Sequence, residues 1–289
     1  MLPTRSSCGL PGRYRRAVGQ SVRGVVVATA VVVLLAACGP GRGAPDPPVS
    51  PRASRATTDA PTGATGTPAA TAPEGGLVRD SGVPLGGPAA LGRDVGSLLP
   101  ADGAHLQVED GLDGSVVTTV TGPPGMLGWV APPRGGRSEV QADGSVTLHD
   151  GAGSVVVALA APTGADGPRG AWRPDGDVLV LDAPAGSVAF VVGLAALESA
   201  TWGDADGGRS LLVVPADWVR RGGLAAQHAL VSELRLAAPE SESASMQAQL
   251  WCHVLGAPDK ASWNIEPWRP EVPTSTMLLT RCNPTDADL

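Results

Sequence analysis

The stretch "DGSVTLHDGAGSVVVALAA" (Asp143–Ala161) predicts the fold class of most of the chain. It begins with an Asp-Gly pair, continues as a short alternating strand, turns through glycines and ends in β-branched residues. Asp-Gly is a favoured hairpin turn, and alternation of apolar and polar residues is typical of a half-buried strand. A second copy, "DGDVLVLDAPAGSVAFVVGLAA" (Asp175–Ala196), follows 32 residues later. Each copy therefore predicts a β-hairpin.

A third copy begins at "DGSVVTTV" (Asp113–Val120), 30 residues before the first. Three such units predict a small β-sheet or sandwich, and we interpret residues 83–196 as a β-rich domain. A repeated Asp-Gly would also suit calcium loops, but the spacing of ligands that such a loop needs is absent, which favours turns. The strand residues expected to face inward are Val146, Leu148, Val178 and Val180.

The sequence changes character after residue 196, where five of the seven tryptophans fall. "SLLVVP" (Ser210–Pro215) predicts a strand that its proline ends. "GLAAQHALVSELRLAAP" (Gly223–Pro239) predicts a helix, with leucines stacked on one face and a terminal proline. "MQAQLWCHVLG" (Met246–Gly256) is compatible with strand or helix, and we interpret it as a strand, as we do "STMLLTRCNP" (Ser275–Pro284). Residues 197–289 thus predict an α+β domain, and the whole chain is mainly β with a C-terminal α+β domain.

The first 37 residues predict a signal peptide. They contain five arginines and no acidic residue, and then an apolar run, "VVVATAVVVLLAA" (Val25–Ala37), that is too short to span a bilayer comfortably. The run ends in "LAAC" (Leu35–Cys38), which resembles the bacterial lipobox. That pattern implies cleavage before Cys38 and attachment of diacylglyceryl and palmitoyl chains, enough for a stable membrane anchor. An uncleaved signal anchor is the alternative, and "RRAVG" leaves Sec and Tat export both open.

Residues 38–82 are rich in Pro, Ala, Thr and Gly and lack any apolar period. Such a segment cannot bury a core, so it predicts a disordered tether with a reach of roughly 35 Å. The expected location is the extracytoplasmic face of the cell membrane, with the membrane as a partner through Cys38.

The cysteines support export. Cys8 lies in the predicted signal and Cys38 is the predicted lipid site, which leaves Cys252 and Cys282 as an even pair. In an exported chain this pair predicts a disulfide, worth roughly 3–4 kcal/mol for a loop of about thirty residues. A metal site beside His253 is the alternative, but no Cys-x-x-Cys and no second clustered His accompany it. We therefore expect no metal and no cofactor.

The charge argues against nucleic acid, and against any anionic polymer, as the main partner. The formal net charge is −7, and loss of the five signal-peptide arginines leaves 16 basic against 28 acidic residues, a net charge of −12. A strongly acidic protein is repelled by the phosphate backbone.

Standard catalytic signatures are missing, so candidate sites come from one polar cluster. His253 is adjacent to Cys252, while Glu266 and Arg269 lie in the loop that the disulfide would close. A His, a carboxylate and an Arg brought together suit general acid–base work, but hydrogen bonds and an ion pair within a core are the favoured interpretation.

The stretch "WNIEPWRP" (Trp263–Pro270) adds a possible binding surface. Trp263, Asn264 and Trp268 could stack on sugar faces and bond hydroxyls, or the two tryptophans could fill a core poor in other aromatics. Exposure of Trp263 or Trp268 would distinguish these alternatives.

Several motifs together resemble a known family. "TWGDADGGRSLLVVPADWVR" (Thr201–Arg220), "MQAQLWCH" (Met246–His253), "SWNIEPWRP" (Ser262–Pro270) and "RCNP" (Arg281–Pro284) occur in order. They resemble the C-terminal domain of actinobacterial secreted proteins classed as a domain of unknown function, over roughly the last ninety residues. The resemblance implies an exported, disulfide-linked envelope protein and names no catalytic residue.

The sequence therefore predicts a cell-envelope lipoprotein. The favoured role is non-enzymatic binding of an envelope component, such as a cell-wall glycan, or of another exported protein. One alternative is an envelope hydrolase that uses His253, Glu266 and Arg269. Another is an inhibitor of an exported hydrolase, in which the loop around Trp268 protrudes.

Overall fold

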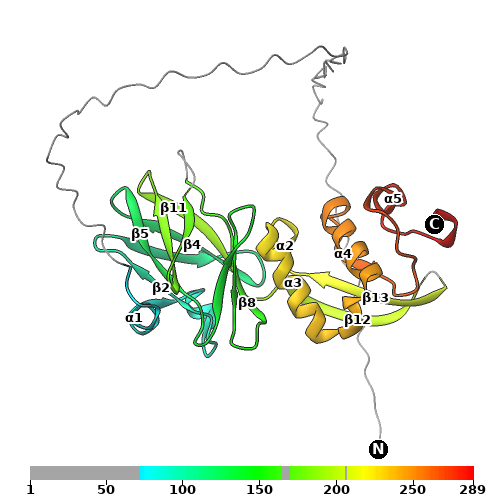
Figure 1. Ribbon diagram of the computed structural model, residues 1–289, viewed down its shortest axis with the longest axis horizontal. Coiled ribbons are helices and arrows are strands. Elements are labelled where there is room, and N and C mark those ends of the chain that lie inside the picture. Colours follow the sequence, from blue (N-terminus) through cyan, green and yellow to red (C-terminus); the bar gives the residue numbers. More distant parts are fainter. Residues whose placement is uncertain (1–71, 165–169, 206) are drawn as a thin grey trace, which may run out of the picture. The chain divides into compact units, whose positions relative to one another are not determined.

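The computed structural model describes residues 72–164, 170–205 and 207–289 (Figure 1). The predicted signal peptide, Cys38 and residues 39–71 of the predicted tether lie outside these ranges. Within them, no helix combines the length and apolar character needed to cross a membrane.

The elements follow one another in two groups, a β-rich group up to residue 193 and a mixed group after residue 196. The first group is α1 (Gly75–Ser81), β1 (Val83–Pro84), η1 (Gly87–Ala90), β2 (Ser97–Pro100), β3 (His105–Asp110), β4 (Ser115–Thr121), β5 (Gly125–Ala131), β6 (Arg137–Val140), β7 (Val146–His149), β8 (Val155–Leu159), β9 (Ala171–Asp175), β10 (Val178–Ala183) and β11 (Ser187–Gly193). The second is β12 (Leu197–Ala205), β13 (Gly208–Pro215), α2 (Asp217–Arg220), α3 (Leu224–Ala237), η2 (Pro239–Glu242), α4 (Ala244–Gly256), β14 (Trp263–Ile265), α5 (Thr274–Leu279) and η3 (Asp286–Asp288).

The β-rich group forms two antiparallel sheets that pack face to face. Sheet A has the order β1-β2-β5-β10-β9, and sheet B has the order β3-β4-β11-β8-β7-β6. Alternating side chains of both sheets meet in one core, as in a β-sandwich. That core includes Leu127 and Leu179 from sheet A and Val120 and Val157 from sheet B. The only phenylalanine, Phe190, contacts Trp172 edge-to-face with ring centroids 4.9 Å apart.

The repeat unit forms a hairpin in only one of its copies. In the first copy β7 pairs with β8, as predicted. In the second copy β10 joins β5 and β9 in sheet A, whereas β11 joins β4 and β8 in sheet B. The predicted hairpin is therefore wrong for this copy. Both of its strands carry an apolar face, and placing them in opposite sheets buries the two faces against each other.

The inward residues of the second copy are also shifted by one. Leu179 and Leu181 of β10 face the core between the sheets. Val178, expected there, packs instead with Val78 of α1 and Ala131 on the other side of sheet A. Val146 and Leu148 do lie in the core between the sheets, as predicted. A central strand buried on both faces has no alternation to reveal which face points inward.

Helix α1 lies within residues expected to belong to the tether. Its Val78 is fully buried, and the backbone N–H of Gly75 donates to both carboxylate oxygens of Asp177, at 3.0 and 3.1 Å. One apolar side chain and one carboxylate beyond the helix therefore order a segment whose composition alone favours disorder.

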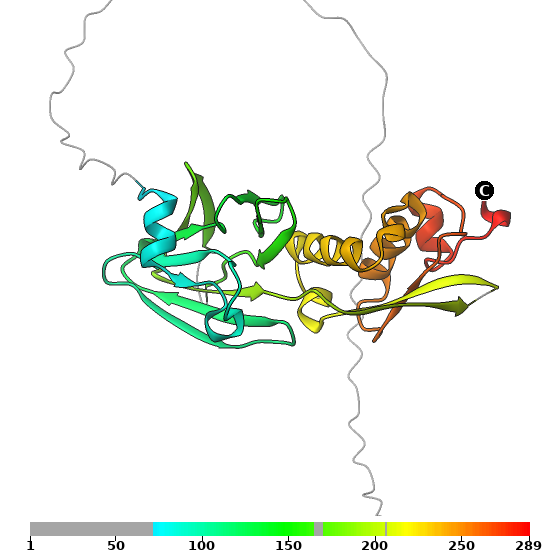
Figure 2. The same cartoon turned by 90° about the horizontal axis from the view of Figure 1, so that it is seen from below.

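The C-terminal group is an α+β unit, as predicted. Sheet C has the order β12-β13-β14, and α3 and α4 lie along one face of it (Figure 2). Leu211 and Val213 of β13 pack there with Leu230 of α3 and Met246 of α4. The predicted disulfide between Cys252 and Cys282 is present and links α4 to the segment after α5.

Two predicted strands are helices. Residues 244–256 form α4, in which buried Met246, Leu250 and His253 recur at helical spacing. Residues 274–279 form α5, with Met277 buried. Both segments are short runs with apolar residues close together, so their periodicity does not separate strand from helix. Packing of α4 against sheet C then selects the helix.

Helix α5 ends in a left-handed turn without glycine. The N–H of Arg281 donates to Leu278 O at 3.1 Å, and the N–H of Cys282 donates to Met277 O at 2.9 Å, the two bonds of a Schellman motif. Arg281 has φ of 54° and Cys282 has φ of 69°. Glycine normally occupies such a position because a Cβ is strained there.

We predict that Arg281→Gly increases the free energy of unfolding by about 0.5–1 kcal/mol, since relief of the left-handed strain exceeds the added entropy of the unfolded chain. Arg281→Ala removes the same side chain and keeps the Cβ, so it should show no gain. Urea unfolding of the oxidised protein measures both. An alanine variant as stable as the glycine variant would contradict the backbone explanation.

Candidate functional site

Glu266 and Arg269 form a buried ion pair. Arg269 Nε lies 2.7 Å from Glu266 Oε2, and neither side chain is accessible, with Glu266 0% exposed and Arg269 5%. Ser210 Oγ of β13 donates to Glu266 Oε1 at 2.9 Å, and Arg269 Nη1 donates to Pro284 O at 3.2 Å. The pair thus connects sheet C to the end of the chain. Each carboxylate oxygen of Glu266 already accepts a hydrogen bond, so the ion pair has the features of a structural interaction that holds these segments together.

The backbone of this loop is also fixed. Gln249 of α4 bonds it twice, donating from Nε2 to Glu266 O at 2.8 Å and accepting from the Glu266 N–H at 2.9 Å. Ser245 Oγ donates to Arg269 O at 2.7 Å. The loop around Trp268 is therefore held against α4 and does not stand free as an inhibitor loop would.

His253 bonds the backbone of the loop and has no hydrogen bond to Glu266 among the described residues. Its Nε2 lies 3.0 Å from Asn264 O and must donate, because a carbonyl only accepts. The ring stacks on Trp263 with centroids 6.2 Å apart. Burial lowers the pKa of His253, and the positive charge of Lys260 lowers it further. The hydrogen bond to Asn264 and the negative charge of Glu266 act in the opposite direction, and the net effect is a lowered pKa. His253 is thus a buried histidine with a lowered pKa, bonded to Asn264, whereas Glu266 and Arg269 bond each other.

The two tryptophans of the loop have different surroundings. Trp263 is 1% exposed, and its Nε1 donates to Ala257 O at 3.0 Å, so it is a core residue. Trp268 is 42% exposed and lies over Gly208, where a Cβ would come within 2.3 Å of its Nε1. Its ring also covers the Arg269 guanidinium, 4.6 Å from the centroid. Asn264 is exposed. Trp268 and Asn264 are therefore the parts of the predicted binding surface that solvent reaches.

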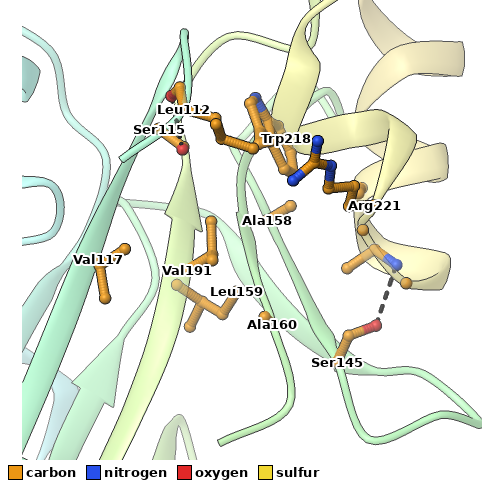
Figure 3. Close-up of a pocket in the computed structure, with 14 residues that line it drawn as sticks. Leu112, Ser115, Val117, Ser145, Ala158, Leu159, Ala160, Val191, Trp218 and Arg221 are labelled. Atoms are coloured by element: carbon orange, nitrogen blue, oxygen red, sulfur yellow. Dashed lines mark hydrogen bonds between the residues drawn. The ribbon is translucent and has the colours of Figure 1, made fainter. Parts of the chain in front are cut away.

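A separate pocket lies between the outer face of sheet B and α2–α3 (Figure 3). Its volume is about 360 Å³, within the range of small-molecule sites. Val117 and Val191 are cross-strand partners on β4 and β11, and Ala158 follows on β8. The full lining is Leu112, Ser115, Val117, Ser145, Ala158, Leu159, Ala160, Val191, Trp218, Arg221, Gly222, Gly223, Ala225 and Ala226.

Hydrogen bonds from the β-rich group fix the helical wall of this pocket. The N–H of Leu224 donates to Asp143 Oδ2 at 2.7 Å, and the N–H of Ala225 donates to Ser145 Oγ at 3.0 Å, so residues far upstream cap α3. Gly223 has no room for a side chain, because a Cβ there would lie 2.1 Å from Asp143 Oδ2. Desolvation would raise the pKa of Asp143, but the bonds from Ser145 and Leu224 outweigh it and lower that pKa.

Two further contacts complete that wall. Glu233 of α3 accepts from the N–H groups of Ala196 and Leu197, with the shortest distances at 2.9 Å. Trp218 Nε1 donates to Ala195 O at 2.7 Å, and its ring lies against Gly193 of β11, where a Cβ would come within 2.2 Å. Both walls of the pocket are therefore held in place without a ligand.

The rim of the pocket carries one charged side chain, Arg221. Figure 3 shows it directed toward Trp218 and Leu112. Arg221 also lines a second hollow of about 380 Å³ with Asp217, Arg220, Pro258, Asp259 and Ala261. In the part of the chain that the structure describes, no three His, Cys, Asp or Glu side chains gather into a metal-binding group.

The sequence alone does not predict this pocket, because its lining residues are spread from position 112 to 226 and come together only in the folded chain. A signal was present in "SVVTTV" and "SVAFVV". Val117 and Val191 stand at outward positions where a solvated sheet would carry polar residues, and this indicates a second covered face.

We predict that His253 makes the protein less stable at acidic pH. Because its pKa is lowered on folding, the unfolded chain binds a proton below about pH 6.5 that the folded protein does not. The free energy of unfolding should fall with pH below that point, by up to about 1.4 kcal/mol per unit.

The variant His253→Gln keeps a donor for Asn264 and cannot titrate, so it should flatten the slope of stability between pH 5 and 7. His105→Gln, at an exposed position, is the matched control and should keep the slope. Urea unfolding across this pH range measures both. An unchanged slope in His253→Gln would show that the neutral histidine is not the cause.

Comparison with known proteins finds similarity in the C-terminal group. The family model described as protein of unknown function (DUF2599) matches residues 197–285. Uncharacterized proteins of Mycobacterium tuberculosis and Mycobacterium bovis are 42% identical over 95 residues, which is 30% of this chain. The chain spans 62% of the length of these relatives. No solved structure matches. Residues 197–285 are therefore similar to a domain of unknown function with relatives in actinobacteria.

Proposed function

We propose that this protein is a membrane-anchored lipoprotein of the cell envelope that binds a small apolar envelope component in the pocket between sheet B and α2–α3. The observation that carries the binding role is the pocket itself, which has a volume of about 360 Å³, a mainly apolar lining and a helical wall fixed by hydrogen bonds. Pockets of this size and lining are the usual sites for small ligands.

The anchoring part of the proposal rests on the sequence. The apolar run Val25–Ala37 and the "LAAC" motif that ends at Cys38 support export and acylation. Two or more acyl chains on Cys38 would hold the protein at the membrane, where apolar ligands are abundant. Residues 39–71 would connect this anchor to the folded part.

The alternative functions have less support. A hydrolase would need His253 and Glu266 to share a reactive surface, but His253 bonds Asn264 and Glu266 bonds Ser210 and Arg269. An inhibitor would need a protruding loop, but Gln249 and Ser245 fasten residues 266–269 to α4. A glycan-binding surface would have only Trp268 and Asn264 of its three predicted residues, because Trp263 is buried.

We predict that Val117→Trp fills the pocket and weakens binding of N-phenyl-1-naphthylamine, a neutral fluorescent apolar probe, by about tenfold or more. Thr119→Trp is the matched control, since Thr119 lies two residues along the same strand and face but outside the pocket lining. Fluorescence titration of the full-length protein in phosphatidylcholine nanodiscs, with empty nanodiscs as blank, measures binding. Equal binding by both variants would place the probe elsewhere.

We also predict that Cys38→Ala reduces palmitate incorporation to background when the chain is expressed in a bacterium that acylates lipoproteins. Cys8→Ala is the control, because Cys8 precedes the predicted cleavage point and should leave labelling intact. Metabolic labelling followed by purification reports both. Label retained on Cys38→Ala would overturn the lipoprotein assignment and leave the pocket assignment standing.

A further inference from the structure

The pocket of about 360 Å³ has an interior that excludes charge. Among the residues that line it, Arg221 alone is charged, and the rest are apolar, serine or glycine. A charged ligand group would lose its hydration in that interior without a partner, which is costly. Any ionised group on a ligand must therefore stay at the rim, beside Arg221.

The neighbouring Arg220 shows how Arg221 differs. Arg220 donates to Pro215 O, Lys260 O and Ala261 O, and it lies 3.4 Å from Asp217 Oδ1. Arg221 is exposed, and among the described residues its guanidinium has no hydrogen bond or ion pair. The Arg220 guanidinium thus has a structural role, whereas the N–H donors of Arg221 are available to a ligand at the rim.

Three carboxylates lie in the second hollow or beside the pocket lining, and one of them, Asp113, is exposed and directly follows Leu112. Asp217 pairs with Arg220, so Asp259 is the remaining carboxylate lining that hollow. The N-terminus of α3 is also near, but its first N–H groups are taken by Asp143 and Ser145. Arg221 is therefore the group to which an anion at this rim would bind.

We infer that the pocket binds an anionic amphiphile, with one alkyl chain in the apolar interior and a carboxylate or phosphate head group on Arg221. This inference rests on the proposed function and adds the chemical class of the ligand. A volume of about 360 Å³ is at the small end of ligand sites, so the alkyl chain should be of medium length.

Displacement of N-phenyl-1-naphthylamine from the full-length protein in phosphatidylcholine nanodiscs tests this inference. The ligands are decanoate, 1-decanol and decyltrimethylammonium, which share a chain and differ in head-group charge. Because every variant is in the same lipid, the ratio of its affinity to that of wild type is independent of partitioning. Compared at equal free aqueous concentrations, shorter alkanoates should bind about fourfold more weakly for each methylene removed.

Arg221→Gln should weaken decanoate about tenfold, leave 1-decanol within twofold and strengthen decyltrimethylammonium. Arg221→Lys should recover part of the decanoate affinity. Arg137→Gln, an exposed arginine on β6 outside the pocket lining, removes the same charge and should change nothing. Lauroyl lysophosphatidylglycerol distinguishes a membrane lipid from a free fatty acid as the source of the ligand. If Arg221→Gln weakens its binding more than it weakens decanoate binding, the ligand is a membrane lipid. If the loss is smaller than for decanoate, the ligand is a free fatty acid.

The outcomes separate the two proposals. If Arg221→Gln changes decanoate and 1-decanol equally, the head-group assignment is overturned and the apolar pocket stands. If no alkyl ligand displaces the probe, or if Val117→Trp binds all of them as wild type does, the pocket itself is overturned together with the proposed function.

Discussion

The attachment of α3 to the outer face of sheet B is the constraint on which the candidate site depends. The N-terminus of α3 has backbone N–H groups with no partner within the helix, and the side chains of Asp143 and Ser145, in the turn before β7, accept hydrogen bonds from two of them. Glu233, further along the helix, accepts from the backbone just after β11. These bonds fix the distance between helix and sheet. Small residues at the contact, Ala158 and Ala226 among them, leave the space that becomes the pocket.

The polar cluster around Glu266 has a different role. A buried carboxylate is stable when its oxygens accept hydrogen bonds from matched donors, and Ser210 and Arg269 provide them. Arg269 also reaches Pro284, and the disulfide holds Cys282 nearby. The chain after β14 makes little regular structure, so the ion pair, the Gln249 amide and the disulfide together hold it on α4.

The sequence reveals those parts of the fold that depend on local pattern. Leu230 and Leu234 repeat at helical spacing before Pro239, and α3 is where that pattern predicts it. The strand β13 ends at Pro215, also as predicted. The structure of some apolar segments depends on packing partners that are distant in the sequence. Residues 246–256 form a helix because they pack against sheet C. Strands β10 and β11 belong to different sheets because each sheet buries the apolar face of one of them. For the pocket, local pattern indicates only a second covered face of sheet B, since Val117 and Arg221 line one cavity only after the sandwich and α3 have packed.

The shared wall of the pocket has a thermodynamic consequence. Its lining comes from both hydrophobic cores, the sandwich through Leu159 and the C-terminal group through Trp218 and Ala226. A bound ligand therefore contacts both and favours only the state in which both are folded. At a hundred times its dissociation constant it adds about 2.7 kcal/mol to that state by mass action. Occupancy of the pocket would thus favour unfolding of the two adjacent cores as one cooperative unit, and a rise in the melting temperature would identify a ligand before its chemistry is known.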